Sequence, residues 1–213
     1  MVVRTTVAAR ARPLLLVSWL AALWLAGCQT LPKPVAPTLA PEQLIGAWPA
    51  RRAQLQARTQ FTAQGRIGVV AGGDGFNGRL RWIQDGARSS VSLDGPLGVS
   101  GVRIINDVDG LSLTTPSGEA LDSQAAHDEL VRRMGFEPPL GSLRFWLQGV
   151  PDPASPSSET ANAEGYLGSL VQSDWTVSFS AYMQTAAGAL PQKLTVTRGT
   201  VRVRLILDSW RAP

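Results

Sequence analysis

Apolar and polar residues alternate along most of the chain from Phe61 onward. The alternation is clearest in Trp175 to Ala181 and in Val201 to Asp208, where the residues at every second position are apolar. A period of two is typical of antiparallel strands with one buried face and one face in water. The same pattern recurs, less regularly, in segments separated by Gly, Asp, Asn or Pro: Phe61 to Val70, Phe76 to Gln84, Ser89 to Leu93, Gly101 to Asn106, Leu111 to Thr114, Gly165 to Gln172 and Leu190 to Thr197.

These many short segments predict a mainly β fold, in which one large antiparallel sheet is curled or closed into a barrel. Helical patterns occur at Pro49 to about Arg58, at Asp122 to Met134 and at Pro139 to Gln148. Asp122 is expected to cap the second helix and Gly135 to end it. The last two helices are adjacent and amphipathic, so we expect them to cover an open face or mouth of the sheet. Asp152 to Thr160 is predicted to be a surface linker.

The start of the chain has the features of a secretory signal peptide. Three arginines precede an apolar run, Leu14 to Leu25, that is short for a membrane-spanning helix. The run leads into Leu25-Ala26-Gly27-Cys28, which matches the bacterial lipobox, in which small residues precede a cysteine that is lipidated. We predict a signal peptide at 1–27, a lipidated Cys28 with a Pro-rich tether over 28–47, and a single domain over 48–213. A free cysteine after an ordinary signal peptide is the alternative.

Removal of this leader changes the charge and leaves one cysteine in an exported protein. The leader holds Arg4, Arg10 and Arg12 of the 20 Lys and Arg residues and none of the 16 Asp and Glu residues, so the formal charge falls from +4 to +1. The charge therefore gives no reason to expect a nucleic-acid partner. Because Cys28 is the only cysteine, no intramolecular disulfide can form, and stability must come from the hydrophobic core.

Sequence motifs give little support for catalysis. Gly73 to Gly78 satisfies G-x-G-x-x-G, but a strand pattern follows it, whereas the dinucleotide motif needs a helix there; a hairpin turn is predicted instead. Gly98 to Val102 falls short of the G-x-S-x-G nucleophile motif. His127 is the only histidine and is expected on a solvated helix face. The residues therefore favour a protein that is not an enzyme and has no metal or cofactor, although hydrolysis by a carboxylate pair stays open.

The chain resembles the LolB outer-membrane lipoprotein receptors of the LolA/LolB lipoprotein-localisation family. The most specific stretch is Pro139 to Pro151, PLGSLRFWLQGVP, which is similar to the proline-leucine, tryptophan-leucine, glycine and proline signature of the family. The resemblance covers nearly the whole mature chain, and its other parts are the lipobox, Trp48 to Leu55 leading to Gly65-Arg66-Ile67, Leu80 to Trp82, Pro96-Leu97-Gly98 and Leu207 to Trp210.

The resemblance implies an incomplete antiparallel β-barrel with inserted helices that cap an apolar cavity. The receptor would accept lipoproteins from the periplasmic carrier LolA by binding their acyl chains, and would insert them into the outer membrane without nucleotide hydrolysis. It would be lipid-anchored at the periplasmic face of that membrane, and we expect a monomer. The residues expected to line the cavity are Trp82, Ile104, Leu113, Leu143, Trp146, Trp175, Val177 and Phe179, although each of them is also compatible with an ordinary core position.

Leu97 stands in a stretch of turn residues, Ser92 to Gly101, where a large apolar side chain is unusual. It either packs beneath the turn or is presented to an apolar partner outside the chain. The resemblance implies the second role, because the family projects a loop leucine that helps to drive cargo into the membrane, and it makes Pro96, Leu97 and Gly98 the membrane-insertion loop. Two further interpretations stay open for the protein as a whole: a scaffold lipoprotein that binds a protein partner, and a lipid-active hydrolase.

Overall fold

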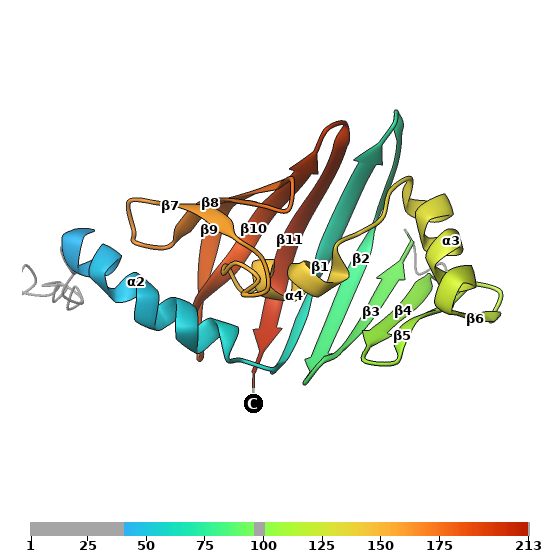
Figure 1. Ribbon diagram of the computed structural model, residues 1–213, viewed down its shortest axis with the longest axis horizontal. Helices are drawn as coiled ribbons and strands as arrows, with labels where there is room; N and C mark the ends of the chain where they lie inside the picture. Colours follow the sequence, from blue (N-terminus) through green and yellow to red (C-terminus); the bar gives the residue numbers. More distant parts are fainter. Residues whose placement is uncertain (1–40, 96–100, 213) are drawn as a thin grey trace, which may run out of the picture. The chain divides into compact units, whose positions relative to one another are not determined.

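The computed structural model describes residues 41–95 and 101–212, with side chains from Gly46 onward. Cys28, Pro96, Leu97 and Gly98 lie outside the described residues. Within them, antiparallel strands form an 11-stranded sheet in the order β6-β5-β4-β3-β2-β1-β11-β10-β9-β8-β7 (Figure 1). The strands are β1 (Gln60–Ala71), β2 (Asp74–Asp85), β3 (Arg88–Asp94), β4 (Val102–Asp107), β5 (Gly110–Thr114), β6 (Ala120–Asp122), β7 (Ser157–Ala161), β8 (Leu167–Gln172), β9 (Trp175–Thr185), β10 (Gly188–Arg198) and β11 (Val201–Arg211).

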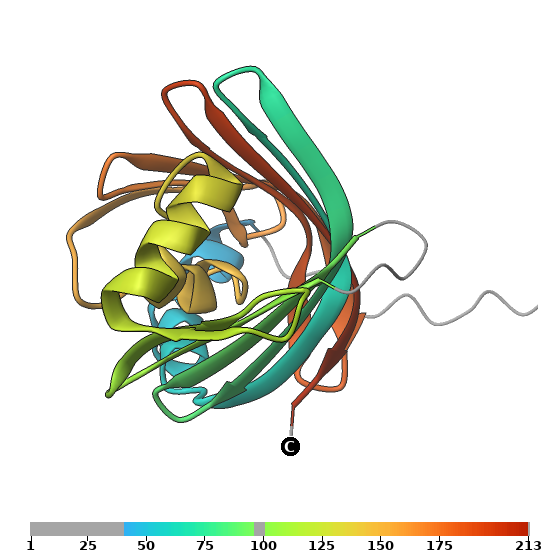
Figure 2. The same cartoon turned by 90° about the vertical axis from the view of Figure 1, so that its right-hand side faces the viewer.

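The chain builds this sheet as two halves that meet in its middle. Strands β1 to β6 follow one another outward, helices α3 (Ser123–Met134) and α4 (Leu140–Trp146) come next, and β7 to β11 return inward until β11 pairs with β1. The free edges are β6 and β7, so the sheet is not closed. It curves around α3 and α4, which lie on its concave side (Figure 2). The predicted mainly β fold, an incomplete barrel with inserted helices, is confirmed.

Two segments differ from the sequence prediction. The first helix, α2 (Pro41–Gln56), begins at Pro41 and contains Pro49 in its interior rather than in its first turn. The second half of the predicted linker belongs to strand β7, which pairs with β8 from Ser157↔Gln172 to Ala161↔Leu167. Its sequence, SSETA, has no apolar alternation, so the strand rests on backbone pairing with its neighbour. No periodic pattern of apolar residues in the sequence predicts the start of α2 at Pro41 or the presence of strand β7.

Helix α2 is fastened to the half of the sheet that holds β7 to β11. Glu159 on β7 accepts a hydrogen bond of 2.9 Å from Trp48 Nε1 and forms an ion pair with Arg52 at 2.6 Å. Leu55 joins a small apolar cluster with Phe145, Val150 and Leu190. These contacts on both sides of Pro49 offset the backbone hydrogen bond that an interior proline removes.

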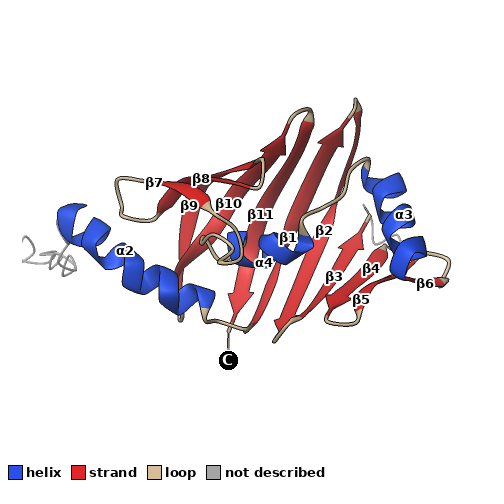
Figure 3. Ribbon diagram, viewed as in Figure 1, coloured by secondary structure: helices blue, strands red, loops and turns tan. Residues whose placement is uncertain are grey.

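Helix α3 has the predicted buried stripe of Ala126, Leu130 and Met134 and ends at Gly135, whose φ of 76° lies in the left-handed region. Asp122 occupies the position before the helix, but its side chain makes no capping hydrogen bond, so the predicted cap was wrong in that respect. Figure 3 shows the helices in blue against the red strands. Among the described residues, no helix combines the length and the apolar character needed to cross a membrane.

The two halves are joined by a close approach of β1 to β11 at Gly65. The register shifts between Gln64 and Gly65, and a Cβ atom on Gly65 would lie 2.1 Å from the backbone oxygen of Ile206. Only glycine fits this contact, since real Cβ atoms do not approach so closely. The side chains of both halves then pack into one hydrophobic core on the concave side.

Candidate functional site

A helical lid covers the middle of the concave face. The lid consists of residues 135–147, which are the connection after α3, helix α4 and the residue that follows it, Leu147. Gly135 ends α3, and the prolines at 138 and 139 lead directly into α4. Proline fixes φ and cannot continue a helix from the preceding segment, so the Pro-Pro pair separates the two helices.

Beneath the lid lies an apolar cavity of about 40 Å³, called the central cavity from here on. The sheet contributes Ile67, Leu80, Trp82, Val91, Leu93, Ile104, Trp175, Val196, Val203 and Leu205. The end of α3 and the lid contribute Met134, Phe136, Pro138, Pro139, Leu140 and Leu143. Every lining side chain is apolar or aromatic, and none of them carries a group that titrates near neutral pH.

The residues that the sequence nominated for the cavity are all buried in the main core, but they divide into two sets. Four of them line the central cavity: Trp82, Ile104, Leu143 and Trp175. The other residues, Leu113, Trp146, Val177 and Phe179, lie in the same core and do not line it. Alternation identified the inward face of each strand, whereas the position of the lid along the sheet decided which inward residues face the cavity.

Several lining residues were missed by the sequence analysis. Ile67, Leu80, Val203 and Leu205 occupy the buried positions of the alternating strands β1, β2 and β11, so the pattern could have found them. Phe136 lies outside any periodic segment and had no such signal. It packs against Trp175, with ring centroids 5.8 Å apart.

Two tryptophan N–H groups near the cavity, those of Trp82 and Trp146, are satisfied by buried amides. Trp82 Nε1 donates to Gln84 Oε1 at 3.0 Å, and Ser89 Oγ donates to the same oxygen at 2.7 Å. Trp146 Nε1 donates to Gln172 Oε1 at 2.8 Å. Because these polar groups bond to each other, the indole rings add apolar surface without leaving an unpaired donor in the core.

The lid is attached unequally at its two ends. Trp146, near its end, is tied to β8 through Gln172, which also bonds the backbone at Asp152 and Ser155. In the part of the chain that the structure describes, no hydrogen bond joins residues 136–143 to a strand. Ser142 Oγ donates to Asp152 Oδ2 at 2.8 Å in the loop that follows the lid, and the contacts of this part of the lid with the strands themselves are apolar.

The central cavity is too small for an acyl chain in this conformation. A water molecule occupies about 30 Å³ in the liquid, and pockets for organic ligands measure roughly 300–1,000 Å³. The lining side chains therefore fill most of the space beneath the lid and leave a cavity of only about 40 Å³. An acyl chain could enter only if the lid moved or the lining side chains rearranged.

No described group suggests a metal or nucleotide site. The ranges 41–95 and 101–212 contain no set of three His, Cys, Asp or Glu residues that could hold a metal ion. The segment at Gly73 lies in the β1–β2 hairpin, as predicted, and strand β2 follows it. His127 lies part-exposed on α3, with Nδ1 3.9 Å from Glu137 Oε1.

The fold and the cavity together define the structural class: an incomplete antiparallel barrel whose concave face holds an all-apolar cavity under a helical lid. The sequence comparisons then identify the family. The family model described as outer membrane lipoprotein LolB matches residues 59–210. This chain belongs to the LolB family.

Curated relatives support this assignment over most of the chain. The outer-membrane lipoprotein LolB of Thiobacillus denitrificans is 34% identical over 88% of this chain and 92% of its own length. That of Nitrosococcus oceani is 31% identical over 88% of this chain and 92% of its own length. Among solved structures, a DUF1329 family protein from Desulfovibrio piger is similar with a TM-score of 0.49 and 11% identity, over 84% of this chain and 94% of that chain. The family assignment rests on the sequence matches.

Proposed function

We propose that this protein is an outer-membrane lipoprotein receptor that accepts lipoproteins by binding their acyl chains in the central cavity and passes them to the outer membrane. The supporting observation is the cavity itself, which is lined only by apolar side chains beneath a lid whose first part has no hydrogen bond to a strand. Apolar contacts are non-directional, so acyl chains can replace them without leaving polar groups unpaired. Family membership supports an interaction with the LolA system, and we propose the carrier LolA as the donor of the lipoprotein.

The small size of the central cavity fits a transfer function. A receptor must bind acyl chains and then release them, so it cannot hold them irreversibly. When the acyl chains leave, the lid side chains Phe136, Leu140 and Leu143 can refill the space, and this recovered packing offsets part of the cost of release. The transfer needs no covalent step and no cofactor.

Cys28 and the loop residues Pro96, Leu97 and Gly98 belong to the same proposal, although they lie outside the described residues. Lipidation at Cys28 would hold the protein at the periplasmic face of the outer membrane. Leu97 would contact lipid during the release of cargo. One buried leucine contributes roughly 1.5–3 kcal/mol, which favours local contact with the bilayer but cannot replace the lipid anchor.

The test uses the mature chain with Cys28→Ala, which cannot be lipidated, and a fluorescent fatty-acyl probe. Saturable binding at one site is expected, followed by displacement with unlabelled fatty acid. Leu140→Gln places a polar amide at the cavity and should weaken binding by about tenfold or more, whereas Leu111→Gln changes a half-buried leucine that does not line the cavity. Absence of a saturable site would overturn the proposal in favour of a scaffold lipoprotein, and ester hydrolysis that persists through purification would favour an enzyme.

A second experiment separates acceptance of cargo from its release. Leu97→Glu is expected to leave transfer from carrier to receptor unchanged and to impair transfer from receptor to membrane vesicles, because a carboxylate is costly to place in lipid. Leu97→Met keeps the apolar character and is the control. If Leu97→Glu impaired both steps or neither, Leu97 would have no specific part in release.

A further inference from the structure

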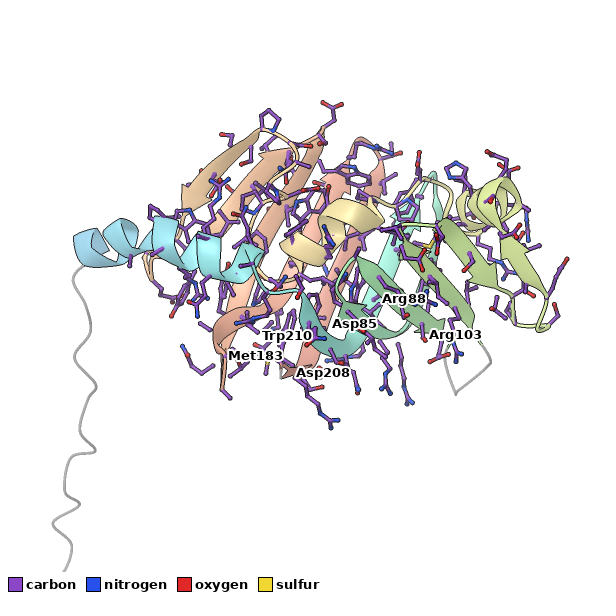
Figure 4. The ribbon with its side chains drawn as sticks, turned by 60° about the horizontal axis from the view of Figure 1, so that its bottom comes forward. Asp85, Arg88, Arg103, Met183, Asp208 and Trp210 are labelled. Carbon is purple, nitrogen blue, oxygen red and sulfur yellow. The ribbon has the colours of Figure 1, made fainter. Side chains whose placement is uncertain are left out.

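The convex face of the sheet, opposite the cavity, carries a band of exposed arginines. Alternation turns Arg66, Arg79, Arg81, Arg103, Arg202 and Arg204 outward from β1, β2, β4 and β11, while their sequence neighbours point into the core. In Figure 4, Arg103 and Asp208 lie on the side of the sheet that faces away from helix α4. These six arginines are called the basic face.

Like charges meet directly within the basic face. Arg66 on β1 is in register with Arg79 on β2. Arg81 and Arg204 are diagonal neighbours of Arg66, because they are in register with Gln64 and Gly68, which lie two residues to either side of it on β1. Diagonal neighbours on a sheet lie about 7–8 Å apart, and like charges directly opposite each other destabilise a sheet. The fold itself therefore gains nothing from this arrangement.

The acids beside these arginines do not neutralise them. Asp208 Oδ1 lies 3.4 Å from Arg66 Nη2, an exposed pair that contributes little, and Asp94 on β3 is in register with Arg79 without forming an ion pair. Further across the sheet, Ser92 on β3 lies between Arg81 and Arg103. It is in register with Arg81 on β2 and with Arg103 on β4. The positive charge therefore extends across neighbouring strands, each about 4.8 Å from the next.

Two exposed apolar side chains accompany this charge. Val70 and Ile83 are 50% and 37% exposed and point outward in the same phase as Arg66 and Arg81. Arg202 and Arg204 line a pocket together with Val70 and Asn77, but the other four arginines do not line it, so the basic face as a whole is suited to an extended surface rather than to one small anion.

We propose that the basic face binds the phosphate groups of an anionic phospholipid surface and holds the convex side of the sheet against the membrane. The choice of a membrane rests on the tether. At about 3.3–3.6 Å per residue, the chain between Cys28 and Pro41 spans at most roughly 45 Å, so a lipidated domain cannot leave the surface. Tethering raises the effective concentration of headgroups, and many weak contacts then suffice. The inference uses the membrane location of the family and does not depend on acyl transfer.

The test uses the mature chain carrying Cys28→Ala, in the absence of lipoprotein cargo. It measures co-sedimentation of this protein with phosphatidylcholine vesicles and with vesicles that also contain phosphatidylglycerol. Binding is expected only with phosphatidylglycerol and should weaken as salt is raised. Arg66→Gln with Arg79→Gln should lower the partition coefficient by roughly 25-fold, because each basic residue removed near the surface contributes about fivefold. Because this variant relieves a like-charge pair, its melting temperature should not fall.

Arg132→Gln with Arg133→Gln on helix α3 is the control, because it makes the same change in net charge away from the basic face. It should alter partitioning less than twofold, since screened charges act only over a short range.

If the Arg66 and Arg79 variant failed to fold, Arg103→Gln with Arg204→Gln would test the same face. Equal effects of the two pairs, or equal binding to both kinds of vesicle, would overturn the proposal. Unchanged vesicle binding with loss of binding to the carrier would also overturn it, and would make the basic face a protein-docking surface. Acyl-probe binding is measured separately, so failure here leaves the proposed function standing.

Discussion

Gln172 on strand β8 accepts the indole N–H of Trp146 at 2.8 Å and so ties the end of the lid to the sheet. The same side chain donates to the backbone oxygens of Asp152 and Ser155, both at 2.8 Å, and accepts from the backbone N–H of Asp152. Gln172 is 1% exposed. One buried amide thus fixes the far end of the lid, while the first part of the lid, residues 136–143, has only apolar contacts with the strands.

Gln172→Met should destabilise the protein substantially. It keeps the approximate size of the side chain, but it leaves the Trp146 N–H without a partner in the core and removes the partner of three part-buried backbone groups, the N–H and oxygen of Asp152 and the oxygen of Ser155. Each unsatisfied buried group costs about 1–3 kcal/mol, so a loss of roughly 3 kcal/mol or more in the free energy of unfolding is expected. Urea denaturation measures it. Gln124→Met, on the exposed face of α3, is the control and should stay within about 0.5 kcal/mol of the parent protein.

Leu143→Ala should separate cavity volume from stability. Leu143 lines the central cavity from helix α4, so truncation enlarges the space beneath the lid and costs about 2–5 kcal/mol in the free energy of unfolding. We expect faster uptake of the fatty-acyl probe in stopped-flow fluorescence, because less packing must be displaced. Leu170→Ala on β8 truncates a fully buried leucine that does not line the cavity, and it should lose stability without faster uptake. Equal uptake rates in the two variants would argue against entry through the central cavity.

Glycine-to-alanine changes should have opposite signs at two positions. In Gly65→Ala, the new Cβ would meet the backbone oxygen of Ile206 at 2.1 Å, so the β1–β11 contact must open, with an expected loss above about 2 kcal/mol. In Gly141→Ala, on helix α4, no atom lies within 4 Å of the new Cβ, and a gain of about 0.5–1 kcal/mol is expected from the helix preference of alanine. Thermal and urea unfolding of both variants test the contrast, which a gain in Gly65→Ala would contradict.

Tyr182 should make stability sensitive to alkaline pH. Burial raises the pKa of its hydroxyl above the usual value, and the hydroxyl donates a 2.7 Å hydrogen bond to the backbone oxygen of Leu167. Since the folded pKa lies above the unfolded one, this contribution is complete below about pH 10 and is lost as the pH rises beyond it. Urea midpoints measured across this range should fall as the pH rises. In Tyr182→Phe the free energy of unfolding should be about 1 kcal/mol lower at neutral pH, and the fall with pH should be shallower. Parallel pH profiles for the two proteins would show that other groups control alkaline unfolding.

Several features of the fold and the candidate site were readable from local patterns. The period of two in β9 and β11 predicts which side chains face inward, because successive side chains of a strand point to opposite faces. Helix α3 was predicted with its buried stripe because its apolar residues recur at helical spacing, and its end was predicted because Gly135 is a typical helix terminator. Strand β7 could not be predicted, because SSETA has no apolar phase and becomes a strand only beside β8.

The sequence by itself determined the inward and outward faces of the strands, the interruption of the sheet by two helices, and the family. These depend on residue spacing and on motifs that are local to the chain. The tertiary structure decided what lies across a strand or beneath the lid: that Trp82, Ile104, Leu143 and Trp175 share one cavity, and that Arg66 stands opposite Arg79. Such relationships depend on strand register and on where the lid rests, and both are set by packing between segments far apart in the sequence.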